Sequence, residues 1–237
     1  MNTEQILWYT KAAPDFNHAL PVGNGRIGAM VFGGTQKETL KLNEDSIYSG
    51  GRRNRINPKA YEGMTEIREL LLNENIAQAE TLAFQKMQGV TPNSRHYMPL
   101  GELTMYFDFT GKAREYIRSL DLTEAVASTR FHDDAGVHFT REVYASYPAQ
   151  LLIIHLTCDT PGKLNFSASL DGREDYYDDN RPVEENVILY TGGTGSRDGI
   201  FFAAGMTVLT KGGTTETIGS AIQVSGADAV SLHQVGA

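Results

Sequence analysis

The first residues that could do chemistry are three glycines, Gly23, Gly25 and Gly28, which have the spacing G-x-G-x-x-G. In dinucleotide-binding proteins this spacing lets the backbone approach a pyrophosphate, provided that a strand precedes the glycines and a helix starts at the third. Here Pro21 interrupts the preceding run, and the apolar residues after Gly28 indicate a strand. The spacing therefore favours tight turns between strands over a nucleotide site.

Pairs of neighbouring acidic residues could supply the two carboxyl groups that glycoside hydrolysis requires. The pairs are Glu44-Asp45, Asp133-Asp134, Glu174-Asp175, Asp178-Asp179 and Glu184-Glu185. Neighbouring residues on a strand point to opposite faces of the sheet, so adjacency in sequence does not create a catalytic pair. Asp133-Asp134 has the composition of a hairpin turn, and Glu184-Glu185 that of a solvated edge. We therefore favour structural roles over catalysis for Asp133-Asp134 and Glu184-Glu185.

The segment 171–180 holds five acidic residues and an asparagine, and their oxygens could bind Ca²⁺. The spacing does not match an EF-hand loop, so a mobile acidic loop is the favoured interpretation. Tyr176 and Tyr177 lie in the same segment and could stack on a sugar ring.

The histidines and the single cysteine give weaker signals. His132 and His138 flank a predicted hairpin turn and could face each other, but two ligands without a third do not form a zinc site. His155 and Cys158 lie in an apolar run and are interpreted as core residues. No serine stands near a histidine and an acid in a pattern typical of a nucleophile. We predict neither a metal nor a cofactor.

The segment 42–51 gathers polar side chains and one aromatic ring where a strand is expected to end. The candidate substrate-binding or domain-interface residues in it are Asn43, Glu44, Asp45 and Tyr48. Such a segment could present hydrogen-bonding groups and an aromatic platform at one rim of a β-fold. It could equally be a capped turn that leads into a helix near Pro58. The residues alone leave both alternatives open.

Two helices are expected between the strands. Asn57 is a suitable N-cap and Pro58 a suitable first helical residue, and a second helix is expected at about 74–87. The apolar stripes that we expect to face a core are Met64, Ile67 and Leu71 in the first helix, and Ile76, Ala79, Ala83 and Met87 in the second.

From Leu100 onward the apolar period changes from 3.6 to 2, as in the runs 103–109, 164–170 and 200–208. Short alternating strands separated by turns indicate antiparallel sheets packed face to face. A final run, 227–233, is expected to stop without a partner strand, as in a fragment. We therefore predict a mainly β fold, one large antiparallel β-sandwich over residues 1–237 with a helical insertion near 58–88. A barrel is the less favoured alternative.

The composition limits the class of partner. The 237 residues are 41% hydrophobic and 21% charged, which is typical of a globular protein with a substantial core. The net charge of −8 argues against a nucleic-acid partner. No apolar run approaches the ~18 residues of a membrane span, and the polar start of the chain predicts no signal peptide.

Several blocks of sequence, in order, resemble the N-terminal domain of family 95 glycoside hydrolases, the inverting α-L-fucosidases and their relatives. The blocks are residues 7–9 (LWY), 20–34 (LPVGNGRIGAMVFGG), 42–46 (LNEDS), 49–51 (SGG), 97–103 (YMPLGEL), 116–122 (YIRSLDL) and 140–148 (TREVYASYP). One departure is visible, since the family commonly has Leu-Trp where this chain has Ile47-Tyr48. An aromatic ring is kept at that position.

The resemblance implies a large, supersandwich-like β-domain that precedes a linker and an (α/α)₆ catalytic barrel. The family's catalytic residues lie in that barrel, so none maps onto this chain. The implied partners are the barrel of the same polypeptide and, for the parent enzyme, a fucosylated or related glycan.

Three functional hypotheses follow. The leading one is a non-catalytic domain that braces the barrel, with the segment around Asn43 and Tyr48 near the interface and no activity of its own. The alternative is a free-standing carbohydrate-binding module that uses Trp8, Tyr48 or the Tyr176-Tyr177 pair. The least favoured is an independent hydrolase with its own carboxylate pair.

Overall fold

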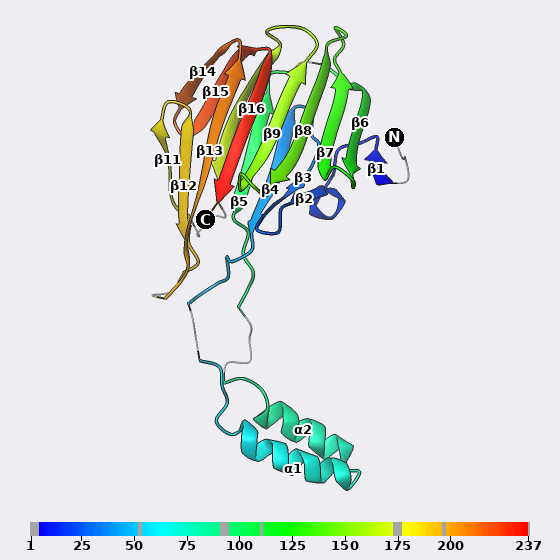
Figure 1. The fold of residues 1–237 in the computed structure, drawn as a ribbon, viewed down its shortest axis with the longest axis vertical. Coiled ribbons are helices and arrows are strands. Elements are labelled where there is room, and N and C mark those ends of the chain that lie inside the picture. Colours follow the sequence, from blue (N-terminus) through cyan, green and yellow to red (C-terminus); the bar gives the residue numbers. More distant parts are fainter. Residues whose placement is uncertain are drawn as a thin grey trace.

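The computed structural model describes residues 5–51, 54–90, 95–109, 111–172, 177–195 and 198–236. Two large antiparallel sheets pack face to face as a β-sandwich, and 53% of the chain is strand (Figure 1). The predicted mainly β, antiparallel sandwich is therefore confirmed.

Within the described residues, one sheet has nine strands and the other seven. In spatial order the nine are β1 (Ile6–Tyr9), β6 (Arg114–Asp121), β7 (Val126–His132), β8 (His138–Ser146), β9 (Leu151–Cys158), β16 (Ala229–Gly236), β13 (Phe201–Lys211), β12 (Val187–Gly193) and β11 (Tyr177–Glu184). The seven are β14 (Thr214–Ile218), β15 (Ala221–Ala227), β10 (Leu164–Asp171), β5 (Gly101–Phe107), β4 (Lys37–Glu44), β3 (Ile27–Val31) and β2 (Leu20–Gly23). A short 3₁₀ turn, Phe16–His18, precedes β2.

The core lies between the two sheets and is built by the alternation that the sequence predicts. Even-numbered residues of β10 and β13 face inward, and odd-numbered residues face outward. Fully buried side chains come from both sheets and include Leu40, Leu103, Met105, Phe166, Leu152, Ile154, Tyr190, Val208 and Leu232. Each such side chain contributes roughly 1.5–3 kcal/mol when it leaves water, so this interface dominates the stability of the sandwich.

A buried ion pair also joins the two sheets. Glu38 of β4 is fully buried, and its carboxylate contacts the guanidinium of Arg141 from β8. The Oε1 atom of Glu38 accepts hydrogen bonds from the N–H groups of Gly33 and Thr39, each at 2.9 Å. The Nη2 atom of Arg141 donates to the carbonyl of Gly34 at 2.7 Å. The pair therefore connects β8 to β4 and to the turn before it.

The glycine fingerprint forms a β-hairpin. Gly23 and Gly28 pair in register between β2 and β3, and Gly25 in the turn has a φ of +94°. The side chain of Asn24 accepts hydrogen bonds from the two N–H groups that follow Gly25. Pro21 lies on β2, an edge strand, where its missing N–H leaves no ladder bond unmade. Since a strand and not a helix follows Gly28, the arrangement agrees with the turn interpretation.

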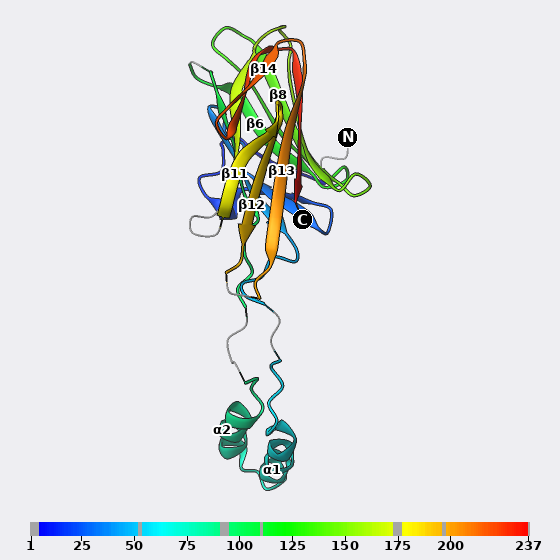
Figure 2. The same ribbon diagram turned by 90° about the vertical axis from the view of Figure 1, so that its left-hand side faces the viewer.

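Between β4 and β5 the chain forms two helices, α1 (Ala60–Leu72) and α2 (Ile76–Lys86). Figures 1 and 2 show them packed on each other and standing apart from both sheets. The predicted insertion is present, but Asn57 is not the N-cap of α1. Its side chain instead accepts a hydrogen bond from the N–H of Lys59 and donates to the carbonyl of Lys86, tying the entry turn to the end of α2.

The expectation that both apolar stripes face a core is wrong. Only Gly63 of α1 and Ala79 of α2 are buried, whereas Met64 and Met87 are 42% and 47% exposed. The helical period identifies which side of a helix is apolar, but it does not say whether another element lies opposite. Here α1 and α2 cover only part of each other's apolar side.

Two further expectations are corrected. His155 is not a core residue, because its neighbours Ile154 and Leu156 face the core and His155 lies on the outer face of β9. Outward-facing Leu151 and Ile153 make the whole run apolar, which hid the alternation. The final run also has partners, since β16 lies between β9 and β13 in the sheet.

Strands occupy part of the segment that was predicted to be an acidic loop. β11 starts at Tyr177, so residues 177–180 are strand rather than loop. Residues 173–176, with Glu174, Asp175 and Tyr176, lie outside the described residues, as do the side chains of Tyr177 and Asp178. The stacking hypothesis for Tyr176 and Tyr177, and the part of the Ca²⁺ hypothesis that involves Glu174, Asp175 and Asp178, therefore fall outside the described residues and side chains. Among the described helices, none has the length and apolar character needed to cross a membrane.

Candidate functional site

The candidate residues lie where β4 ends and the chain leaves the sandwich. Asn43 and Glu44 are the last two residues of β4, and Asp45 and Ser46 form the turn that follows. Because side chains alternate along a strand, Asn43 is directed outward and Glu44 inward. Asp45 is exposed, and Tyr48 is half-exposed. The structure thus separates the four candidates, and only Asn43 and Tyr48 become parts of one cluster.

Glu44 stabilises the turn. Its Oε2 atom accepts hydrogen bonds from the N–H of Ser46 at 2.8 Å and from the Ser46 hydroxyl at 2.7 Å. The Nη1 atom of Arg26 lies 3.6 Å from Oε1. Burial raises the pKa of Glu44, but the hydrogen bonds from Ser46 and the charge of Arg26 outweigh burial, so the pKa lies below its usual value. An ionised, hydrogen-bonded carboxylate of this kind is suited to structure and not to general acid catalysis.

Tyr97 joins Asn43 and Tyr48 into one cluster on the outer surface. The Nδ2 atom of Asn43 donates to the Tyr97 hydroxyl at 2.5 Å, and that hydroxyl donates to the carbonyl of Glu44 at 3.1 Å. The rings of Tyr48 and Tyr97 meet edge to face, with their centroids 4.9 Å apart. The sequence alone did not single out Tyr97, although Tyr97 opens one of the blocks that resemble family 95, because its contacts with Asn43 and Tyr48 join segments about 50 residues apart.

A shallow hollow of about 450 Å³ adjoins this cluster, on the outer face of β2, β3 and β4. The side chains that shape it include Phe16, Met30, Lys41, Asn43, Tyr97 and Pro99. Lys41 is ion-paired with Glu102 of the neighbouring strand. Since no carboxylate lines this hollow among the described residues, it suits contact with an apolar or weakly polar surface better than acid–base chemistry.

Arg26 links three segments at the same end of the sandwich. Its Nε atom donates to Oε1 of Gln150 at 2.7 Å, and its Nη1 atom donates to the carbonyl of Gly236 at 2.6 Å. The same guanidinium faces the carboxylate of Glu44. Arg26 therefore brings the end of β16 beside the end of β4, from which the helices depart. It is a positioning residue that sequence reasoning missed.

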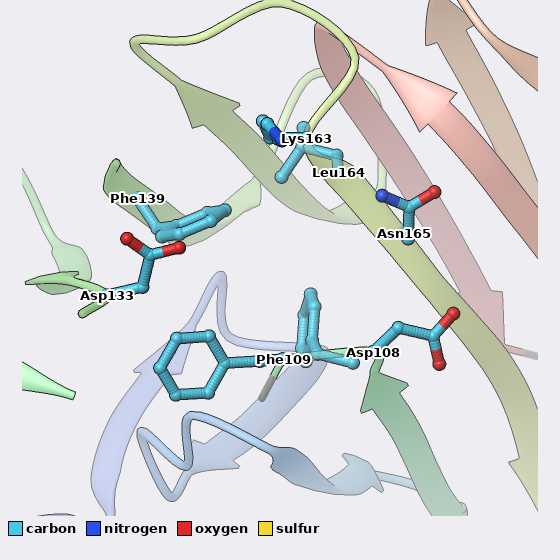
Figure 3. Close-up of a pocket in the computed structure, with 8 residues that line it drawn as sticks. Asp108, Phe109, Asp133, Phe139, Lys163, Leu164 and Asn165 are labelled. Carbon is cyan, nitrogen blue, oxygen red and sulfur yellow. The ribbon is translucent and has the colours of Figure 1, made fainter. Parts of the chain in front are cut away.

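A second hollow, of about 240 Å³, opens at the opposite end of the sandwich (Figure 3). It is lined by Asp108, Phe109, Asp133, Phe139, Lys163 and Asn165, among others. In Figure 3 the carboxylates of Asp108 and Asp133 point away from each other. One oxygen of Asp133 also accepts two N–H groups of its own turn, as its sequence context predicts. The hollow offers hydrogen-bonding groups and phenyl rings, but not a converging acid–base pair.

The histidines do not build a metal centre in the described part of the chain. His132 and His138 pair across β7 and β8 with ring centroids 5.2 Å apart, as predicted. No group of three or more His, Cys, Asp and Glu side chains is placed to hold a metal ion among the described residues. Cys158 packs against the core, also as predicted.

One serine lies beside a histidine on the outer face of the nine-stranded sheet. The Oγ atom of Ser231 is 2.9 Å from Nε2 of His233, two residues along β16, and His155 is opposite Ser231 in register. In a regular sheet the backbone N–H groups are used in the ladder, so none is left to stabilise an oxyanion. The arrangement does not form a nucleophilic site.

Comparison with known proteins identifies relatives over most of the chain. It is 34% identical over 178 residues to "Alpha-L-fucosidase 2" of Arabidopsis thaliana, which covers 74% of this chain and 21% of that protein. It is 34% identical over 194 residues to "Probable alpha-fucosidase A" of Aspergillus oryzae, which covers 78% of this chain and 25% of the relative. The chain thus spans about a fifth to a quarter of the length of these relatives.

A solved structure has the same fold. The chain described as "Putative kojibiose phosphorylase from human microbiome" superposes with a TM-score of 0.52 at 11% identity, over 98% of this chain and 32% of that one. A likeness at this identity shows the fold alone. The family model for "Glycosyl hydrolase family 65, N-terminal domain" matches residues 7–236. The matching model is thus that of family 65, whereas the sequence blocks resemble family 95. The protein belongs to the family of glycosyl hydrolase family 65 N-terminal domains.

Proposed function

We propose that this domain is non-catalytic and braces the catalytic barrel of a longer, α-L-fucosidase-like glycoside hydrolase of family 95 type. One observation carries the proposal: the contacts of Arg26 gather Glu44, Gln150 and Gly236 at one end of the sandwich. The cluster of Asn43, Tyr97 and Tyr48 lies at the same end. A polypeptide that continues beyond residue 236 would begin there.

The chemistry of the described residues supports the same proposal. Hydrolysis of a glycoside requires two carboxyl groups about 5–9.5 Å apart on either side of one bond. Glu44 is buried in its turn, and Asp108 and Asp133 point apart. The fucosidase relatives, which are four to five times as long as the region matched in them, support an α-L-fucoside as the substrate class of the parent enzyme.

The first test is an activity assay. The isolated chain should release no product from aryl or oligosaccharide α-L-fucosides, while the full-length protein should. Hydrolysis by the isolated chain that persists after purification would overturn the non-catalytic assignment.

The second test addresses bracing. Tyr48→Ala removes a half-exposed ring, so it should lower the melting temperature of the isolated chain only slightly. In the full-length protein the same change should lower the melting temperature or kcat/KM more strongly. Tyr106→Ala is the control, because Tyr106 is also a partly exposed tyrosine (52% against 41% for Tyr48) but lies on the outer face of β5 toward the other end of the sandwich. Equal effects of the two variants in the full-length protein would contradict bracing by this end.

A second candidate function, sugar binding by this domain itself, is favoured by the hollow of Figure 3. Asp108, Lys163 and Asn165 can hydrogen-bond hydroxyl groups, and Phe139 can contact the apolar side of a sugar ring. Calorimetry with fucosylated oligosaccharides tests it. Binding that weakens in Lys163→Ala, and not in Glu216→Ala on β14, supports the candidate, and no measurable heat excludes it.

A further inference from the structure

The helical insertion carries more exposed large hydrophobic residues than any other part of the described chain of similar length. Five side chains of α1 and α2 are between 53% and 79% exposed, namely Tyr61, Leu71, Leu72, Ile76 and Phe84. Scattered exposed apolar residues are normal, but a contiguous patch on a small unit marks an interaction surface. No strand of the sandwich packs against these helices in the described chain, so the sandwich does not bury these side chains.

The exposed apolar residues lie on one side of the helix pair. The helices are antiparallel, since Gly63 of α1 packs against the side chain of Lys86 of α2, which also ion-pairs with Glu66. Each residue of a helix is rotated by 100° about the helix axis from the one before it. Measured in that direction of rotation, the exposed apolar residues lie between about 60° and 180° beyond the buried residue in both α1 and α2. Because the two helices are antiparallel and face each other, this rotation places the exposed apolar residues of both helices on the same side of the pair.

The other side of the pair is polar. Glu62, Glu66 and Glu69 are on that side of α1, and Gln78 and Gln85 are on that side of α2. The pair is therefore amphipathic as a unit, with Arg68 and Glu80 as the charged residues that lie among the exposed apolar ones. An amphipathic unit of this kind is typical of an element that lies on a larger apolar surface.

The pair cannot derive much stability from its own contacts. α1 has 13 residues and α2 has 11, and isolated helices shorter than about 12–15 residues are marginal in water. Gly63 and Ala79 are the buried residues of these two helices. A covering surface would supply the burial that the pair lacks.

The position of the pair indicates what covers it. The chain leaves the sandwich for α1 just after Glu44, and Arg26 holds Gly236 beside Glu44. Figure 1 shows the C-terminal end of the chain at the end of the sandwich from which the helices extend. The fucosidase relatives are four to five times longer than the matched region. Polypeptide that follows residue 236 in a full-length protein therefore starts next to the base of the helical insertion.

We propose that the α1–α2 pair is a docking arm whose apolar side, built from Tyr61, Leu71, Leu72, Ile76 and Phe84, binds the domain that follows residue 236 in the same polypeptide. This inference rests on the proposed function, and it names the element that makes the contact. The apolar residues of this arm were expected, from the sequence alone, to pack in the core of the domain.

Hydrogen exchange tests the proposal on two proteins, the isolated chain and the full-length polypeptide. The backbone amides of α1 and α2 should exchange rapidly in the isolated chain and at least about 100-fold more slowly in the full-length protein. Leu71→Glu combined with Phe84→Glu should abolish that extra protection, because two charges would be buried at the interface. Leu209→Glu is the control, because Leu209 lies on the outer face of β13 and is as exposed as Leu71; this change should leave the extra protection of α1 and α2 unchanged.

Three results would overturn the docking arm. They are equal protection in both proteins, protection that survives the double variant, and protection in the isolated chain that grows with concentration, which would indicate a second copy as occupant. Failure of the docking-arm proposal can be distinguished from failure of the proposed bracing function. If Tyr48→Ala destabilises the full-length protein while the arm stays unprotected, bracing stands without the arm.

Discussion

Arg141 of β8 and Glu38 of β4 form a buried ion pair that links the nine-stranded sheet to the seven-stranded sheet. Burial raises the pKa of Glu38, and the Arg141 guanidinium and the N–H groups of Gly33 and Thr39 oppose that rise. Both side chains are buried, so bulk water does not reach either charge to stabilise it once its partner is removed. The pair is therefore a point where one substitution should have a large effect.

Arg141→Met should destabilise the protein by about 3–5 kcal/mol, since it leaves the Glu38 carboxylate buried without its counter-charge. Adding Glu38→Gln should restore more than half of that loss, because glutamine can still accept from Gly33 and Thr39 without a charge. Urea unfolding of the two variants and the parent measures both values. Additive losses in the double variant would show that packing, and not the unpaired charge, sets the cost.

The pH dependence of stability should show the ionisation of Glu44. The folded-state pKa of Glu44 is lowered, so ionised Glu44 stabilises the protein above its unfolded pKa of about 4.3, and the stabilisation is lost as the pH falls through the folded pKa. Glu44→Gln should therefore cost about 1–2 kcal/mol at neutral pH and much less in acid.

Unfolding free energies measured across this pH range for the parent and for Glu44→Gln provide the check. The control is Glu216→Gln, an exposed residue of β14, which should give a pH-independent difference near zero. A loss for Glu44→Gln that stays constant into acid would contradict the role of ionised Glu44.

The sandwich was predictable from the sequence because the strand pattern is local. The runs 164–170 and 200–208 show on which face each side chain lies without any knowledge of the partner strands. His155 was wrongly predicted to be a core residue because Leu151 and Ile153, on the outer face, are apolar as well, so the sequence of β9 shows no alternation of polar and apolar residues. The apolar stripes of the helices were wrongly predicted to face a core for a related reason. Periodicity identifies the apolar side of a helix, but not whether another element packs against it.

The candidate site was less predictable, because it depends on contacts between distant segments. Asn43 and Tyr48 were selected from one stretch of sequence, but Tyr97 and Arg26, which hold the arrangement together, come from elsewhere. Alternation along β4 could have separated Asn43 from Glu44 before the structure was known. The hydrogen bond between Arg26 and Gly236 had no signal in the sequence, since it joins two ends of the chain.

Gly33 should tolerate no side chain. Its φ of +76° is strained for other residues, and an added Cβ would lie 2.6 Å from the Tyr116 hydroxyl and 2.8 Å from Cδ of Arg118. Gly33→Ala should therefore cost more than the roughly 1–2 kcal/mol of the backbone strain alone. Gly136→Ala is a matched control, with a φ of +83° and open space around the added methyl group. Equal losses of melting temperature in the two variants would show that the contacts around Gly33 relax without cost.

Tyr97→Phe tests the cluster at the end of β4 by removing one oxygen atom. The hydroxyl accepts from Asn43 and donates to the carbonyl of Glu44, so its loss should cost about 1 kcal/mol in the isolated chain. Tyr106→Phe should cost little, because the Tyr106 ring is half-exposed on the same sheet and its contact with Lys37 is through the ring face, which phenylalanine keeps. Thermal unfolding of both variants gives the comparison. If the two losses are equal, the hydroxyl of Tyr97 does not order the segment, and Asn43 would be positioned by β4 alone.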